Sequence, residues 1–152
     1  MIRFIRSSEK KRIIEQLNEQ FGISKLPYLL LGVGKEKTRG FSGSLSKEEI
    51  MQISKLVNIE LIGLYMLKEE SDYRISFDAI NLLQQQITKN IVEINDSEYE
   101  RWIRGHDIEK PCQTGSVAIK YKSDFLGCGK SNGKIIFNYV PKDRRLKTQI
   151  PI

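Results

Sequence analysis

Long apolar runs, cysteine and histidine are all scarce in this sequence of 152 residues. Its longest apolar stretch, Leu29–Val33, is far shorter than the roughly 20 residues that cross a bilayer. The N-terminal residues also lack the apolar core of a signal peptide. We therefore expect a cytoplasmic protein. In that reducing compartment, Cys112 and Cys128 are expected to remain thiols.

The same scarcity argues against catalysis and against a metal site. His106 is the single histidine, and no nucleophile and base accompany it in a recognisable set. As zinc ligands, His106, Cys112 and Cys128 are one short of the usual four and lack paired short spacings. Pro111-Cys112 has no glycine-rich turn nearby that could bind S-adenosylmethionine. We expect a protein that is not an enzyme, with no cofactor and no metal.

A nucleotide-binding loop is excluded for a different reason. Gly129-Lys130-Ser131 matches the end of the phosphate-loop pattern, but the first glycine of that pattern is replaced by Asp124. Asn132-Gly133 follows, which is a hairpin turn signal and not the start of a helix. The segment therefore predicts two strands joined by a turn.

Positive charge is what the sequence has, and it is concentrated at one end. From Lys110 to the C-terminus there are nine lysines and arginines against two acids, or +9 − 2 = +7, while the whole chain carries +6. The hydrophobic fraction of 39% and the charged fraction of 29% are typical of a soluble globular protein. A basic, turn-rich β segment makes nucleic acid the first partner to consider.

The candidate binding residues are mainly cations at the ends of predicted strands and around a loop. Phosphate contacts need long cationic side chains spread over a surface, and unpaired bases stack on aromatic or arginine planes. We assign Phe125 and Phe137 to the core, and simple loop exposure remains an equal interpretation of His106. The candidates are Arg101, Arg104, His106, Lys110, Lys130, Lys142, Arg144 and Arg145.

Hydrophobic periodicity and turn signals predict mixed α and β structure up to about residue 89. Ser46 and Glu49 form a capping box, and Asp78 is a candidate cap for a third helix. Gly34–Gly40 is predicted to be a loop. The remaining predictions are helices at Ser8–Phe21 and from Ser46 to about Leu56, and strands at Tyr28–Val33, Phe41–Ser44, Leu61–Leu67 and Asp72–Phe77.

After residue 89 the pattern becomes mostly β. A strand at Lys89–Ile94 is followed by a short helix at Asp96–Arg104, which Gly105 ends. Alternation predicts a strand at Ser116–Lys122, and two more strands flank Asn132-Gly133.

This C-terminal third resembles a PUA-type RNA-binding domain, and in particular the PUA-like domain of Sun-family RNA 5-methylcytosine methyltransferases. The residues that carry the resemblance are Arg101–Ile108, Gly115–Lys130 and Asn138–Leu146. The resemblance implies a small β pseudobarrel that binds structured RNA through the loop after its helix and through its late strand. The large catalytic domain of the Sun enzymes is absent, so their activity is not carried over.

Residues Ser46–Leu83 are similar to the pre-PUA domain of archaeal and eukaryotic ribosome-biogenesis factors. We therefore predict an α+β protein with a mixed α/β pre-PUA-like domain at 1–89 and a PUA β pseudobarrel at 90–152. The expected function is non-catalytic RNA binding in rRNA or tRNA maturation or modification. The alternative is an accessory subunit that recruits an RNA-modifying enzyme, such as a methyltransferase, or an RNA-processing complex. Leu29–Val33 and Leu61–Leu67 are its possible apolar docking elements.

Overall fold

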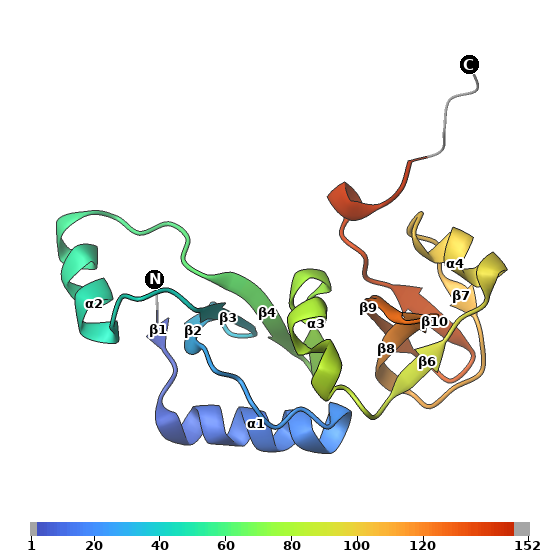
Figure 1. Ribbon diagram of the computed structural model, residues 1–152, viewed down its shortest axis with the longest axis horizontal. Coiled ribbons are helices and arrows are strands. Elements are labelled where there is room, and N and C mark those ends of the chain that lie inside the picture. Colours follow the sequence, from blue (N-terminus) through green and yellow to red (C-terminus); the bar gives the residue numbers. More distant parts are fainter. Residues whose placement is uncertain (1–2, 148–152) are drawn as a thin grey trace.

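Two five-stranded sheets lie side by side along the long axis of the molecule, with helix α3 between them (Figure 1). The structure is a computed structural model that describes residues 3–147. The first nine elements along the chain are β1 (Arg3–Phe4), α1 (Ser7–Phe21), β2 (Leu29–Val33), β3 (Lys37–Phe41), α2 (Lys47–Leu56), β4 (Leu64–Glu69), β5 (Tyr73–Ile75), α3 (Phe77–Leu83) and the 3-10 turn η1 (Gln84–Gln86). We call these elements the N-terminal unit.

The elements that follow form the C-terminal unit. They are β6 (Ile91–Glu93), α4 (Asp96–Trp102), β7 (Ile108–Glu109), β8 (Gly115–Tyr121), β9 (Asp124–Ser131), β10 (Ile135–Asn138) and the 3-10 turn η2 (Lys142–Arg144). Both units mix helices and strands, so the predicted α+β class is confirmed. The division of the chain into two domains near residue 89 stays a prediction.

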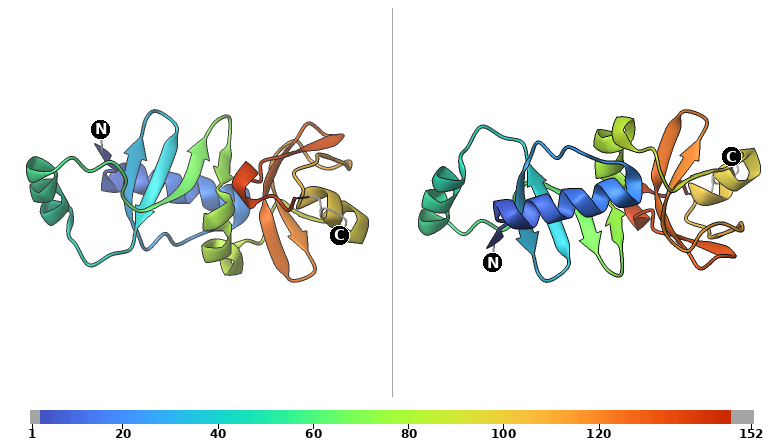
Figure 2. Two further views of the ribbon diagram at one scale, coloured as in Figure 1. Left: turned by 90° about the horizontal axis from the view of Figure 1, so that it is seen from above. Right: turned by 90° about the horizontal axis from the view of Figure 1, so that it is seen from below.

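The first sheet is antiparallel throughout, in the order β1-β2-β3-β4-β5. One of its faces is covered by α1, which runs beneath the strands (Figure 2). Helix α1 packs there because Ile13, Leu17 and Phe21 recur at helical spacing and are all buried. Each such side chain contributes about 1.5–3 kcal/mol when fully buried. Gly22 ends the helix in the left-handed conformation, with φ of 87°.

The second sheet has the order β6-β8-β9-β10-β7, with β6 and β8 parallel and the other pairs antiparallel. It is curled into a half-barrel with α4 beside it, and this form is consistent with the predicted PUA pseudobarrel (Figure 1). The predicted hairpin at Asn132-Gly133 is confirmed, because β9 and β10 pair on either side of it. The Asn132 side chain accepts hydrogen bonds from the backbone of Lys134 and Ile135, which fixes the turn.

The two units share one apolar core. Ala118, Phe125 and Cys128 of the second sheet belong to the same buried cluster as Ile75 and Ala79 of the N-terminal unit. A second cluster, around Trp102, lies inside the C-terminal unit. One face of the β8-β9 pair therefore packs on the N-terminal unit and the other covers α4.

Several details of the predicted elements are wrong. Residues Lys37–Phe41 form β3, so the predicted loop at Gly34–Gly40 is only a short turn followed by a strand. This strand ends at Phe41, so the predicted strand at Phe41–Ser44 is wrong as well. The cap of α3 is Ser76, whose side chain accepts a hydrogen bond from the backbone of Ala79, and Asp78 lies inside the first turn. Of the possible docking elements, Leu29–Val33 and most of Leu61–Leu67 lie in interior strands of the first sheet, with Leu31 and Leu67 fully buried. Leu61 lies before β4 and is 73% exposed, so a docking role for this end stays a prediction.

Within the described residues, none of the helices is both long enough and apolar enough to cross a membrane.

Candidate nucleic-acid interface

Helix α4 places the loop that carries most of the candidate residues. Asn95 caps the helix and forms a capping box with Glu98, in which each side chain bonds the backbone of the other residue. Trp102, at the end of α4, is fully buried, and its indole Nε1 donates to the carbonyl of Leu126 at 2.8 Å. Because the tryptophan is held at both its ring and its backbone, the following loop leaves the helix from a fixed point.

Asn138, at the end of β10, holds this loop in place. Its side-chain Nδ2 donates to the carbonyls of Trp102 (2.8 Å) and His106 (3.0 Å). Its backbone N–H donates to Asp107 Oδ1 at 2.8 Å, and its own Oδ1 accepts from the backbone of Val140. One asparagine thereby ties the helix loop to the late strand.

The segment after β10 closes on the same loop. The backbone of Leu146 donates to the carbonyl of Ile103 at 2.7 Å. Arg145 lies so close to Gly105 that a Cβ on that glycine would be 2.5 Å from Arg145 Cδ. Gly105 also has φ of 91°, a conformation that favours glycine, so the turn requires this residue, and a side chain there would push Arg145 aside.

Four of the predicted residues meet around this loop, and we call them the loop cluster: Arg101, Arg104, His106 and Arg145. Arg101 and His106 are exposed, and Arg101 donates to the carbonyl of Asp107 at 3.3 Å. Arg104 pairs with Glu100 at 2.6 Å, but the glutamate is 61% exposed. Exposed ion pairs are worth little, so an incoming phosphate can compete for the arginine. Arg145 donates its Nε to the carbonyl of Val140.

The other four predicted residues lie elsewhere. Lys110 pairs with Glu98 at 3.1 Å, on the capping side of α4. Arg144 points to the N-terminal unit, where it pairs with Asp78 at 2.9 Å. Lys142 forms no ion pair among the residues that the structure describes, and it is exposed on η2.

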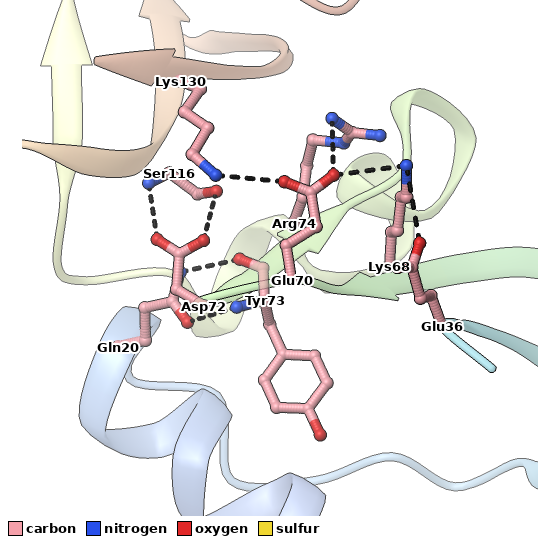
Figure 3. A network of polar contacts seen from close by, with 9 residues as sticks. All are labelled: Gln20, Glu36, Lys68, Glu70, Asp72, Tyr73, Arg74, Ser116 and Lys130. Carbon is pink, nitrogen blue, oxygen red and sulfur yellow. Dashed lines mark hydrogen bonds and ion pairs between the residues drawn. The ribbon is translucent and has the colours of Figure 1, made fainter. Parts of the chain in front are cut away.

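Lys130 lies at the junction of the two units and not at the helix loop (Figure 3). Its Nζ bonds Glu70 Oε2 at 3.0 Å. This hydrogen bond is the largest influence on both groups: it lowers the pKa of Glu70 and raises the pKa of Lys130. Nearby, Asp72 accepts hydrogen bonds from the backbone and the hydroxyl of Ser116, at 2.6 and 2.9 Å. Polar contacts thus join the units beside their shared core.

The aromatic residues follow the sequence predictions only in part. Phe125 is buried as predicted, at 8% exposure, but Phe137 is 41% exposed and its assignment to the core was wrong. Phe137 alternates with the buried Ile136, so its side chain leaves β10 on the outer face. Tyr121 stacks on Tyr99 of the helix, with ring centroids 4.1 Å apart.

The cysteines and the Gly-Lys-Ser segment are built into the sheet. Burial raises the pKa of the Cys128 thiol to about 12, and the Cys112 sulfur lies 3.1 Å from the Ser131 hydroxyl. Gly129–Ser131 are the end of β9, and a hairpin follows them in place of a helix. No group of three or more metal-ligating side chains occurs within residues 3–147.

The C-terminal unit is similar to a known protein family. Residues 89–146 match the family described as the PUA domain of the methyltransferase RsmF. The C-terminal portion of the chain therefore matches the PUA domain of the Sun-family type that its sequence resembles. No curated protein matches the chain. The half-barrel beside α4 and the Asn138 contacts accordingly belong to the PUA domain, and PUA domains of RNA methyltransferases indicate RNA binding.

Two residues of this interface were not among the predicted site residues. Asn138 occurs in the segment that carries the PUA resemblance, but only the structure shows its hydrogen bonds to the helix loop. Asn95 stands three residues before Glu98, a spacing that matches a capping box and could have located the start of α4.

Proposed function

We propose that this protein binds RNA through the loop cluster of its PUA domain and acts in rRNA or tRNA maturation or modification without catalysing a reaction itself. The observation that supports the proposal is the anchoring of the α4 loop by Asn138, in and beside which Arg101, Arg104, His106 and Arg145 lie. Preorganised cations of this kind suit phosphate contacts, because little side-chain and loop freedom remains to be lost on binding.

RNA titrations at several salt concentrations test the proposal. Each phosphate contact contributes about 0.7–0.9 to the slope of log affinity against log salt. The double variant Arg101→Gln/Arg104→Gln is therefore expected to lower the slope by about 1.5 with rRNA and tRNA fragments. The matched control is Lys11→Gln/Lys25→Gln, which removes two exposed cations from the N-terminal unit. An unchanged slope in the loop variant would show that this loop does not contact phosphate.

A second candidate function is supported by an apolar surface on the N-terminal unit. Several large apolar side chains around α2 are exposed, including Leu56 at 84%, Leu61 at 73% and Val57 at 57%. Such a patch is a feature of protein-binding surfaces. It favours a role as an accessory subunit that recruits an RNA-modifying enzyme or RNA-processing complex. Pull-down from native lysate by the intact protein and by a Leu56→Lys/Leu61→Lys variant distinguishes the two roles, because only the accessory role predicts a stoichiometric partner that the variant loses.

A further inference from the structure

Three cations stand directly opposite one another across the first sheet. Lys37 on β3 is in register with Lys68 on β4, and Lys68 is in register with Arg74 on β5. Residues in register point to the same face of a sheet, so we call these three residues the cation row. Like charges directly opposite each other on neighbouring strands are destabilising. The row therefore costs stability unless something compensates for it.

The cation row lies on the face of the sheet opposite α1, where Arg74 is the least accessible of the three, with 13% of its side chain exposed. Leu67 and Ile75, which alternate with the row on β4 and β5, are buried on the opposite face. Helix α1 covers that opposite face, and the view from above shows β3, β4 and β5 in front of it (Figure 2). Lys37 is exposed, and Lys68 keeps 26% of its side chain exposed.

The carboxylates around the row compensate for only part of its charge. Glu70 lies 3.2 Å from Lys68, 3.6 Å from Arg74 and 3.0 Å from Lys130 (Figure 3). Glu36 approaches Lys68 at 3.8 Å. Four cations, the row and Lys130, thus pair with two carboxylates, and the charge of Asp72 also acts on Lys130, so the formal balance is +4 − 3 = +1. Among the residues that the structure describes, Lys37 forms no ion pair.

Aromatic rings extend this cationic face onto the PUA domain. The Lys37 ammonium lies 5.4 Å from the ring centre of Tyr65, and the Arg74 guanidinium lies 3.8 Å from that of Tyr139. Tyr65 and Arg74 line the same small cleft as Tyr139 and Pro141, which follow β10. Tyr139 itself is 40% exposed. The surface is thus continuous from β3 to the segment that leads to the loop cluster.

We propose that the cation row and the adjoining Tyr139 bind a second stretch of RNA backbone, next to the RNA held by the PUA domain. The inference rests on the proposed function, since it extends the same RNA across both units. Phosphate groups would neutralise the positive charge of the row that Glu36 and Glu70 leave uncompensated. The bases of single-stranded RNA stack on exposed aromatic rings that lie beside cations. The polar face of the first sheet is then part of the binding surface.

The experiment compares Lys37→Gln with Lys11→Gln, which removes an exposed cation from α1 on the opposite side of the sheet. The probe is polyuridylate, a single strand without base pairs, titrated against the whole protein at several salt concentrations. Lys37→Gln is expected to lower the salt slope by about 0.7, or about fivefold in affinity near 0.1 M salt. Lys37→Gln relieves repulsion within the row, so thermal unfolding is expected to show no loss of stability.

Arg101→Gln/Arg104→Gln is measured in parallel, so that the two proposals fail separately. If Lys37→Gln binds like Lys11→Gln while the loop variant binds weakly, the cation row is not an RNA site and the PUA proposal stands. If neither variant differs from its control, both proposals are wrong. If only Lys37→Gln weakens binding, the loop cluster does not bind RNA, and the cation row does not extend an RNA site of the PUA domain.

Discussion

Replacing Asp72 by alanine is expected to destabilise the whole protein, because this carboxylate joins the two units. It accepts two hydrogen bonds from Ser116, at 2.6 Å from the backbone and 2.9 Å from the hydroxyl. Hydrogen bonds to a charged group are worth about 1.5–3 kcal/mol each, and Ser116 is only 3% exposed, so water replaces them poorly. Asp72 itself is partly exposed, which reduces the sum. We expect a loss of about 2–4 kcal/mol.

Urea unfolding at neutral pH, followed by fluorescence of Trp102, measures this loss as a shift of the midpoint at constant slope. The control is Asp143→Ala, since Asp143 is 81% exposed and 4.0 Å from Arg144. Its effect is expected to stay within about 0.5 kcal/mol. Equal effects of the two substitutions would refute the reasoning, because the junction would then contribute no more than a surface contact. Two separate transitions in the parent protein would refute it as well, since the shared core implies one cooperative unit.

Two more predictions concern the loop and the junction. Asn138→Ala removes the hydrogen bonds to the carbonyls of Trp102 and His106 without changing any charge. RNA affinity should therefore fall, while the salt slope changes by less than in the arginine variants. Equal affinities of the parent and this variant would show that Asn138 does not hold the loop for binding. The pKa of Glu70 is lowered and that of Lys130 is raised, so their contact stabilises the fold above about pH 4.3 and below about pH 10.4. It is lost as pH falls through the folded pKa of Glu70 or rises through that of Lys130. The urea midpoints of the parent and of Glu70→Gln should therefore differ most inside that window and converge as the pH moves beyond it in either direction.

Local signals in the sequence were enough to locate several elements. The spacing of Ile13, Leu17 and Phe21 predicts α1, and the structure buries those side chains. The Ser46–Glu49 capping box starts α2 as predicted. These signals succeed because a capping box or a helical stripe is determined by residues a few positions apart.

Predictions that depend on what covers a strand were less reliable. Lys37–Phe41 did not look like a strand, because two of its three outward positions, Lys37 and Arg39, are charged and the inward ones are Thr38 and Gly40. Phe137 was assigned to the core because it is aromatic, yet its face of β10 is only partly covered. Both errors arise from tertiary packing, which a local pattern does not report.

Some features of the candidate site could likewise be predicted from local sequence, and others depend on tertiary packing. The sequence predicts cations at loop ends, and Arg145 does reach the α4 loop. It does not predict that Lys130 and Arg144 turn toward the acids Glu70 and Asp78. Those acids are 60 and 66 positions away in the sequence, so only the docking of the two units brings them into contact.

The shared core also affects which RNAs can bind. Ala118 and Cys128 are buried against the N-terminal unit, so the two units cannot turn relative to each other without exposing apolar surface. The separation between the cation row and the α4 loop is then a fixed length. If RNA reaches both surfaces, as proposed, it must present phosphates at that spacing. The proposal therefore implies selection by the path of the RNA backbone as well as by charge.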